Sequence, residues 1–451
     1  MYLTAVDAED SNRVLSNVMR PDVKFSDVLG LDSVKKELEF FKQYFLKPRE
    51  YLRKGFNPPK GLLLYGPPGT GKTMIAKALA GESDVTFLQT TGNDFQKGNY
   101  SESVDEVKRV FRTARKYAPS VIFIDEIDAV ARNRMNNSST SDAQLLNAFL
   151  TEMDGFSKDP SKPVLVLGAT NFDVYNGSLD PALMRRFDRK IYISLPVLSD
   201  RRKYLTDKTQ KEIFDVSEDI IENIAIRSVD MSLAELEGVV DLAMRTAGFE
   251  GSDKVTDEIF ENAFETFNIG EKRSTDVTNI KRIACHESGH ALMCCLGGNT
   301  PVYVTIVSRG DAGGYVMPEI NEESHVLTRS EMLNKIRISL GGRAAEIVCY
   351  GEEDGLSIGA SSDLNKATRI AKAIIMAYGM YDDFGMSTDI SLVSPEKLKE
   401  KIDSILKTEL NNAIELIKQN RDKLDALCDE LIKKNRLMSK EIESIVNIKG
   451  E

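Results

Sequence analysis

The chain has 451 residues, of which 41% are hydrophobic and 29% are charged, a composition typical of a soluble globular protein with about two to four domains. Its formal net charge of −11 argues against a general nucleic-acid-binding protein, because such proteins usually carry a basic excess. No run approaches the roughly 18 uninterrupted apolar residues that span a bilayer, and the N-terminus has no signal-peptide pattern.

The five cysteines form no Cys-x-x-Cys pair, and an odd number suits reduced thiols in a cytosol. We therefore expect a cytoplasmic protein. Membrane association would need a segment that this sequence does not contain, and such a segment would place the chain at the cytoplasmic face.

The first strong pattern along the chain is a phosphate-binding motif. Residues 1–22 are polar and mixed, which indicates an arm or linker, and a helix is expected at Ser33–Phe45. Gly61–Tyr65 is a short apolar run that predicts a buried strand, and helical spacing follows at Met74–Gly81. Between them lies G-x-x-x-x-G-K-T, made of Gly66, Pro67, Pro68, Gly69, Thr70, Gly71, Lys72 and Thr73.

This motif has a direct physical use. Its backbone N–H groups can surround phosphate oxygens at a helix N-terminus, where the helix dipole also favours anions. Lys72 supplies a positive charge to the β- and γ-phosphates, and the Thr73 hydroxyl is placed for Mg²⁺. A glycine-rich turn without a ligand would explain neither the Lys-Thr pair nor the strand–loop–helix context.

Two further apolar runs end in polar residues suited to the same site. Val121–Ile124 ends in Asp125 and Glu126, and the carboxyl end of a buried strand lies beside the phosphate loop in an open α/β sheet. Asp125 therefore suits Mg²⁺ coordination, and Glu126 is a candidate to polarise the attacking water. Pro163–Gly168 leads to Asn171, which could orient that water from the adjacent strand.

A cationic cluster follows, with arginines at positions 185, 186 and 189. Arginines far in sequence from the phosphate loop can contact the γ-phosphate of a nucleotide bound to a neighbouring subunit. Without other evidence, however, a cluster of arginines is more often part of the solvated surface. Strands alternating with helical patterns from 61 to 195 predict a doubly wound parallel sheet. From Ser199 to Phe267 the sequence is helical and charged, which predicts a small helical domain over the nucleotide. Its most regular helix is expected at Ala234–Ala247.

Beyond a boundary at 268–276 lies His286-Glu287-Ser288-Gly289-His290. In a helix the i, i+4 spacing puts both imidazoles on one face, where they can share a metal ion. With a third protein ligand, zinc keeps one open position for water, whose pKa it lowers to roughly 7. Glu287 can take that water's proton and deliver it to a leaving amine. The motif predicts a zinc-dependent peptidase.

The alternative is a surface helix that carries His-Glu-x-x-His by chance. Apolar flanking residues argue against it, because they would bury these polar groups. Gly289 costs about 1 kcal/mol relative to alanine inside a helix, which indicates that another group approaches closely there. Sequence logic leaves both Glu346 and Asp363 as candidates for the third ligand, since spacing cannot choose between them.

The C-terminal part is predicted to be mostly helical. Two short extended stretches are expected at Tyr303–Ser308 and Gly314–Met317. Leu398–Leu437 is an amphipathic helical region with an expected break near Asn420. His325 lies in a polar stretch and receives no role.

Together these motifs resemble the FtsH-type AAA+ zinc metalloproteases, and the likeness extends from about Val23 to Gly385. The other short blocks that carry it are Phe25–Gly30, Thr151–Phe156, Ala169–Asn171, Arg186–Arg189, Leu340–Glu346 and Gly359–Leu364. The resemblance implies a homo-hexameric, ATP-dependent and processive zinc metalloendopeptidase with Zn²⁺, ATP and Mg²⁺ as cofactors. Such an enzyme unfolds and translocates damaged or unfolded polypeptides and cleaves them with a zinc-bound water.

The resemblance also implies individual roles. Asn171 corresponds to the nucleotide-sensing position, and Arg186 and Arg189 to fingers that reach the neighbouring subunit. The third zinc ligand would be Asp363, with Glu346 as a hydrogen-bonding partner of the ligands. Gly313–Val316 resembles an edge strand on which a substrate peptide could pair.

The implied organisation has four parts: an arm (1–22), a large AAA+ α/β subdomain (23–196), a helical lid (197–270) and a zinc metallopeptidase domain (271–451). Four departures from the family stand out. The family's membrane-spanning N-terminal part is not in this sequence, and the pore-loop aromatic is displaced to Tyr100. In addition, the Pro-Gly before the finger arginines is missing, and Leu233 replaces a glycine in the helical domain's nucleotide-facing turn. The competing hypothesis is a non-proteolytic AAA+ remodelling chaperone with a degenerate peptidase domain.

Overall fold

The computed structural model describes residues 18–56, 60–98, 100–131, 140–155, 162–175, 179–272, 279–309, 313–318, 327–354, 360–381, 384 and 394–447. By its internal contacts the chain divides into two compact units, Met1–Asp241 and Leu242–Glu451. Each unit is considered by itself.

The first unit is built on a six-stranded sheet with the strand order β1-β3-β4-β5-β2-β6. Strands β2 to β6 pair in parallel, and β1 adds an antiparallel edge beside β3. Apart from this edge, the predicted doubly wound parallel sheet is confirmed. The strands are β1 (Val18–Met19), β2 (Gly61–Tyr65), β3 (Thr86–Thr91), β4 (Ser120–Asp125), β5 (Val164–Thr170) and β6 (Arg189–Tyr192).

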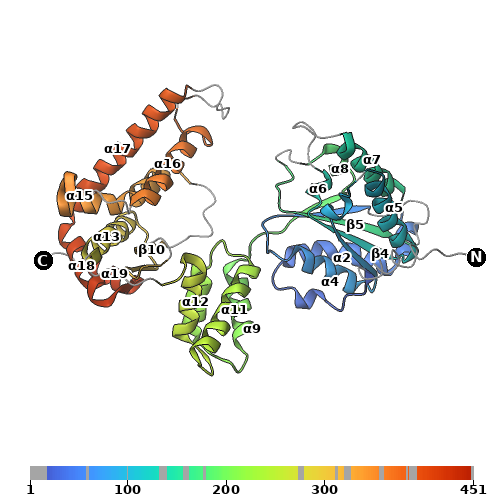
Figure 1. The fold of residues 1–451 in the computed structure, drawn as a ribbon, viewed down its shortest axis with the longest axis horizontal. Coiled ribbons are helices and arrows are strands. Elements are labelled where there is room, and N and C mark those ends of the chain that lie inside the picture. The colour runs from blue at the N-terminus through green and yellow to red at the C-terminus, as the bar shows by residue number, and fades with distance from the viewer. Residues whose placement is uncertain are drawn as a thin grey trace, which may run out of the picture. The chain divides into compact units, whose positions relative to one another are not determined.

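Helices cover both faces of this sheet (Figure 1). Leu62 and Leu64 face one core with Leu38 and Ile75, whereas Leu63 faces the other core. Such two-sided burial explains the uninterrupted apolar run that predicted β2. One face carries α2 (Asp32–Leu46) and α4 (Lys72–Glu82), and the other carries α5 (Tyr100–Lys116) and α7 (Thr140–Asp154). The shorter helices are η1 (Phe25–Asp27), α3 (Pro48–Arg53), η2 (Gly92–Phe95), α6 (Asp128–Ala131) and α8 (Pro181–Met184).

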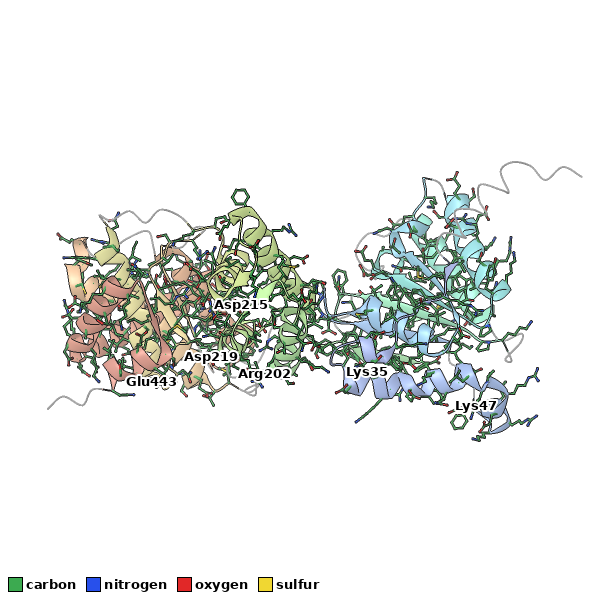
Figure 2. The ribbon with its side chains drawn as sticks, turned by 90° about the horizontal axis from the view of Figure 1, so that it is seen from below. Lys35, Lys47, Arg202, Asp215, Asp219 and Glu443 are labelled. Carbon is green, nitrogen blue, oxygen red and sulfur yellow. The ribbon has the colours of Figure 1, made fainter. Side chains whose placement is uncertain are left out.

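A helical segment follows the sheet. It contains α9 (Leu198–Thr209), β7 (Phe214–Asp215), α10 (Glu218–Arg227) and α11 (Leu233–Glu250). The guanidinium of Arg201 is buried and donates to the carbonyls of Ala225 and Pro196, both at 2.9 Å. The neighbouring Arg202, labelled in Figure 2, lies at the surface and pairs with Glu222. The boundary between the two units lies inside α11.

The second unit is mostly helical, as predicted, around a small antiparallel sheet with the order β10-β9-β11. Its first elements are β8 (Val255–Thr256), α12 (Asp257–Ile269), α13 (Ile280–Leu296), β9 (Tyr303–Thr305) and β10 (Tyr315–Met317). They are followed by α14 (Arg329–Ser339), α15 (Gly341–Asp354), α16 (Ser361–Met376), α17 (Pro395–Gln419), α18 (Arg421–Lys434), β11 (Arg436–Met438) and α19 (Ser439–Val446).

Helix α13 lies at the centre of this unit and packs against α15 and α18. A Cβ atom on Gly289 would lie 2.5 Å from both the Ala345 Cβ and the Gly341 carbonyl oxygen. The glycine therefore lets α15 cross α13 closely, which confirms the close approach that the sequence indicated.

The C-terminal helices contain one correction. The break at Asn420 is confirmed, but the helical region ends at Lys434 and does not reach Leu437. Asn435 adopts a left-handed conformation with φ of 60°, which ends the helix. Leu437 then lies in β11, paired with Val304 and fully buried. Among the helices of the described ranges, none is both long and apolar enough for a membrane crossing.

Candidate metal and nucleotide sites

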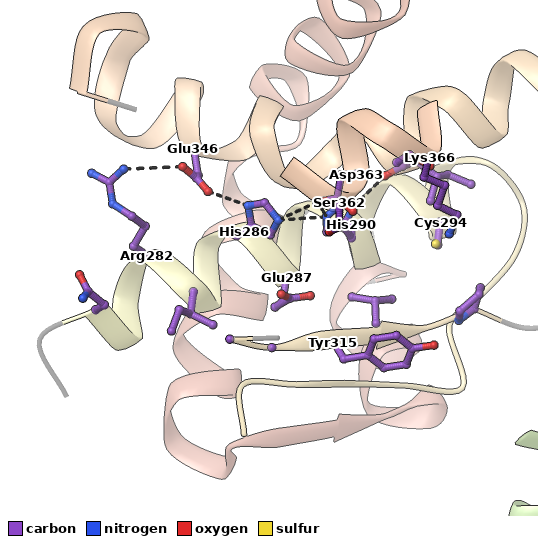
Figure 3. Close-up of a pocket in the computed structure, with 18 residues that line it drawn as sticks. Arg282, His286, Glu287, His290, Cys294, Tyr315, Glu346, Ser362, Asp363 and Lys366 are labelled. Carbon is purple, nitrogen blue, oxygen red and sulfur yellow. Dashed lines mark hydrogen bonds and ion pairs between the residues drawn. The ribbon is translucent and has the colours of Figure 1, made fainter. Parts of the chain in front are cut away.

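Helix α13 presents His286, Glu287 and His290 from one buried stretch, and α16 brings Asp363 to them (Figure 3). The Nε2 atoms of the two histidines are 3.2 Å apart. The Asp363 Oδ2 atom lies 3.2 Å from each of them. In the described part of the chain, these three residues form the one group of histidine, cysteine or acidic side chains with the geometry for a metal ion.

The outer nitrogens of both rings are held by other groups. His290 Nδ1 donates to the Ile338 carbonyl at 2.8 Å, because a carbonyl oxygen can only accept. His286 Nδ1 lies 2.6 Å from Glu346 Oε1. Both contacts favour the tautomer that leaves the Nε2 lone pair free to bind a cation.

The geometry fits zinc. A tetrahedral zinc ion with bonds of about 2.0–2.1 Å keeps its ligand atoms about 3.3 Å apart. Burial alone would lower the pKa of His286, but hydrogen bonds to Asp363 and Glu346 raise it to about 10. The surrounding carboxylates thus favour positive charge at the position where the three ligand atoms converge.

Glu287 points away from the histidine rings towards strand β10 (Figure 3). Burial raises the pKa of its carboxyl group, although the two histidines oppose this shift. A Cβ atom on Gly314 would lie 2.6 Å from Glu287 Cγ, so the strand backbone passes directly beside the side chain. Both residues line a cavity of about 630 Å³.

The predicted edge strand is present in this cavity wall, although it runs from Tyr315 to Met317 and the two glycines of the predicted Gly313–Val316 precede it. Strand β10 pairs with β9 on one side and is the outer strand of its sheet. Gly313, Gly314, Tyr315 and Val316 all line the cavity beside the histidines and Glu287.

The two candidates for the third ligand have different positions. Asp363 contributes an oxygen to the converging group, whereas Glu346 contacts the opposite nitrogen of His286. The Arg282 Nη1 atom lies 3.6 Å from Glu346 Oε2, so a chain of contacts runs from Arg282 through Glu346 to His286. Sequence reasoning missed Gly342, where a Cβ atom would lie 2.6 Å from His286 Cδ2.

The phosphate loop connects β2 to α4 in the first unit. Its last glycine, Gly71, has φ of 91°, a conformation that favours glycine. Lys72 donates to the carbonyls of Gly66 and Pro67 at 2.8 and 2.7 Å, and burial lowers its pKa. The Thr73 hydroxyl donates to Asp125 Oδ2 at 3.2 Å.

A cavity of about 1100 Å³ adjoins this loop. Glu126, Asn171 and the predicted nucleotide-facing residue Leu233 line it together with Lys72 and Thr73. The structure thus brings the P-loop lysine and threonine together with Asp125, Glu126 and Asn171. It also shows a contact that the sequence did not suggest: the Asn93 amide donates to Glu126 Oε2 at 2.9 Å.

The two predicted finger arginines lie elsewhere. Arg189 pairs with Leu62 in the parallel β2–β6 ladder, while the phosphate loop begins after Tyr65 at the other end of β2. Arg186 makes two hydrogen bonds to Asp154, at 3.0 and 2.8 Å. Neither arginine lines the nucleotide cavity of its own chain.

Some sequence hypotheses fall outside the described residues. These are Asn99 and the side chain of Tyr100 in the predicted pore loop, Phe156 and Gly359 in two family blocks, and His325.

Comparison with known proteins decides the family. Residues 62–195 match the ATPase family associated with various cellular activities (AAA), and residues 273–445 match Peptidase family M41. ATP-dependent zinc metalloprotease FtsH 2 of Thermoanaerobacter sp. (strain X514) is 36% identical over 434 residues, 94% of this chain and 83% of that protein.

The chain belongs to the FtsH family.

Two other members cover a similar part of this chain. ATP-dependent zinc metalloprotease FtsH of Leptotrichia buccalis is 37% identical over 452 residues, and the YME1 homolog of Schizosaccharomyces pombe is 35% identical over 443 residues. The alignments cover 95% and 94% of this chain. The chain spans only 57% and 61% of these two relatives' own lengths.

The comparisons confirm the predicted class, an AAA ATPase joined to a zinc metallopeptidase, at the level of the family. The names of the FtsH relatives specify ATP and zinc, in agreement with the predicted cofactors Zn²⁺, ATP and Mg²⁺. The competing hypothesis of a remodelling chaperone with a degenerate peptidase domain receives no support from them.

Proposed function

We propose that this chain is an ATP-driven processive endopeptidase, in which nucleotide hydrolysis feeds unfolded polypeptides to a zinc-dependent cleavage site. The observation that carries the proposal is the convergence of His286 Nε2, His290 Nε2 and Asp363 Oδ2 in a chain that also contains a complete phosphate loop. A motor is needed because folded proteins resist cleavage unless they are opened.

In the peptidase, His286, His290 and Asp363 hold the zinc ion, and Glu346 orients His286. Zinc held there supplies Lewis acidity towards water and a peptide carbonyl. Glu287 accepts the proton of the attacking water on its carboxylate and passes it to the leaving amine. Burial raises the pKa of this carboxyl group, which suits a group that must hold a proton between the two transfers. Strand β10 binds the substrate backbone as an added strand.

In the ATPase, residues 66–73 hold the phosphates, Asp125 and Thr73 hold Mg²⁺, and Glu126 activates water with Asn171 as its orienting partner. Arg186 and Arg189 act on the nucleotide of a neighbouring copy. The position of Arg189 beside Leu62, at the end of β2 away from its own phosphate loop, supports action between copies. The assembly we propose is a homo-hexameric ring.

We assign residues 1–22 to an arm, 23–196 to the large AAA+ subdomain, 197–270 to its lid and 271–451 to the peptidase. The two family matches support the boundaries near 196 and 271, because they end at 195 and begin at 273. Val18 and Met19, at the end of the arm, form the edge strand β1 of the large subdomain's sheet. The five free cysteines support a cytoplasmic location. The formal net charge of −11 supports the proposal that nucleic acid is not a partner.

The test is zinc content measured together with ATP-dependent degradation of casein. We expect about one zinc ion per chain and degradation that stops with a chelator. Glu287→Gln should keep zinc and ATP turnover but lose proteolysis, and Glu126→Gln should bind ATP but hydrolyse it poorly. Casein degradation by protein without zinc at His286, His290 and Asp363 would refute the proposal.

A further inference from the structure

Three cysteines lie on the metal-binding helix and on two helices that pack against it. Cys285 lies on α13, Cys349 on α15 and Cys428 on α18, and all three are free thiols. The Sγ atoms of Cys285 and Cys349 are 2.8 Å apart, although 64 positions separate the two residues in sequence. Helix α18, which carries Cys428, packs against α13. None of the three lines the catalytic cavity.

This thiol pair spans the same two helices as the contact that orients a zinc-binding histidine. Cys285 directly precedes His286, and Cys349 follows Glu346 by three residues, about one helical turn. His286 Nδ1 and Glu346 Oε1 are 2.6 Å apart. A disulfide between the cysteines would therefore link α13 and α15 next to this histidine–glutamate contact.

The two thiols differ in accessibility. Cys285 is only 3% exposed, whereas Cys349 is half-buried and is the one that a small solute can reach first. The Arg421 guanidinium donates to the Val348 carbonyl at 3.1 Å, next to Cys349. The hydrogen bond from Cys285 and the charge of Arg421 hold the pKa of Cys349 below its usual value. An accessible thiol of this kind next to a resolving cysteine is the arrangement of redox sensors.

We propose that Cys285 and Cys349 form a peroxide-responsive dithiol whose disulfide slows peptide-bond cleavage at the adjacent zinc site. The regulatory part of this inference rests on the proposed function. The sulfur of Cys349 attacks one oxygen of hydrogen peroxide, the O–O bond breaks, and a sulfenic acid and one water form. The sulfur of Cys285 then attacks the sulfur of Cys349, the S–O bond breaks, and a second water leaves. Two thiols are oxidised by two electrons in total, and one peroxide is reduced to two waters.

Close packing explains why the disulfide affects catalysis. A disulfide requires a sulfur–sulfur distance of about 2.0 Å and a fixed dihedral angle, so the two side chains must readjust. Helices α13 and α15 cross without a gap at Gly289, where a Cβ atom would lie 2.5 Å from the Ala345 Cβ. Because a closely packed interior transmits small displacements, we expect the contact between His286 and Glu346 to shift.

The experiment uses the full chain with zinc bound. It is treated with hydrogen peroxide, its remaining thiols are blocked, and its disulfides are mapped by mass spectrometry. We expect a Cys285–Cys349 link, a loss of casein cleavage of about 10-fold or more, unchanged ATP turnover, and recovery with dithiothreitol. Cys349→Ser should keep basal cleavage and lose the reversible response. Cys295→Ser, which removes a thiol from the same helix α13, should respond as the unmodified chain does.

Several outcomes would overturn the inference. A link between Cys285 and Cys428, or no link at all, would refute the proposed pair. A Cys285–Cys349 disulfide with unchanged cleavage would refute the regulatory role, as would a reversible loss of activity in Cys349→Ser. Untreated protein that never cleaves casein would refute the proposed function, and with it the regulation. The disulfide map would still show whether Cys285 and Cys349 form a disulfide, because that result does not depend on cleavage.

Discussion

At the scale of single residues, two glycines contact two different parts of the metal site: one lies against a metal ligand and the other against the residue that carries the proton. Gly342 lies against the imidazole of His286, and Gly314 lies against the side chain of Glu287. Each leaves no room for a methyl group. Substituting either one therefore disturbs one function of the site and leaves the other in place.

Gly342→Ala should reduce zinc binding. The added Cβ would lie 2.6 Å from His286 Cδ2, so the ring must turn away from the converging ligand atoms. We expect zinc content and casein cleavage to fall together by about 10-fold or more, with ATP turnover retained. Zinc is measured by atomic absorption after dialysis against a weak chelator. Gly248→Ala on α11, where a Cβ meets nothing within 4 Å, is the matched control. A Gly342→Ala protein with full zinc content and full cleavage would contradict this account.

Gly314→Ala should leave zinc in place but slow cleavage. Its Cβ would lie 2.6 Å from Glu287 Cγ and 2.8 Å from the Thr305 carbonyl oxygen, so Glu287 or strand β10 must shift. Because general base catalysis contributes about 10²–10⁴-fold, we expect a loss of at least 10-fold in casein cleavage. Zinc content measured in the same samples checks the separation. If zinc and cleavage were lost together, the two glycines would not have distinct roles.

The limits of sequence prediction are also visible at this scale. The spacing of His286 and His290 was sufficient to predict a shared helix face, and Gly289 correctly indicated a close approach. The choice between Glu346 and Asp363 was not determined, because it depends on how α15 and α16 pack against α13. Contacts such as Asn93–Glu126 and Cys285–Cys349 have no local pattern, since each joins residues that are distant in sequence.

At the scale of elements, strand β11 is the part of the fold that periodicity could not predict. The amphipathic spacing of α18 continues to Leu437, and only the left-handed backbone at Asn435 ends the helix. The strands of the first unit were easier to predict. Burial on both faces gave them continuous apolar runs bounded by glycine and acidic residues.

Leu437→Ala tests whether β11 belongs to the core of the second unit. Leu437 is 0% exposed and packs in the cluster that surrounds α13, so truncation should lower the free energy of unfolding by about 2–5 kcal/mol. Urea unfolding of the zinc-bound protein, followed by circular dichroism, gives this quantity for the transition of the second unit. Leu296→Ala at the end of α13 is the control, since that side chain is 37% exposed and should cost much less. Equal losses in the two variants would show that β11 contributes no more than a surface residue.

At the scale of the whole molecule, the second unit contains a helix from the predicted lid. Helix α12 lies before the peptidase motif in sequence, yet buried ionic contacts bind it to the peptidase segments. The Glu265 Oε2 atom of α12 lies 2.9 Å from Arg309 Nη2, and the side chains of Glu265 and Arg309 are 4% and 6% exposed. Arg436 of β11 also pairs with Glu265, and Arg309 donates to Asn262 at 2.6 Å. We infer that α12 moves with the peptidase segments of the second unit.

Glu265→Gln should therefore weaken the coupling between ATP hydrolysis and proteolysis. Loss of one partner from a buried ion pair typically costs about 3–5 kcal/mol, because the other charges remain buried. We expect ATP-driven casein degradation to fall more than cleavage of a short unstructured peptide, which needs the zinc site alone. The ratio of the two rates is the measured quantity, and retained peptide cleavage shows that the peptidase remains folded. Glu222→Gln removes one charge from a surface pair with Arg202 and should leave the ratio unchanged. If Glu265→Gln also left the ratio unchanged, these buried contacts would not couple ATP hydrolysis to proteolysis.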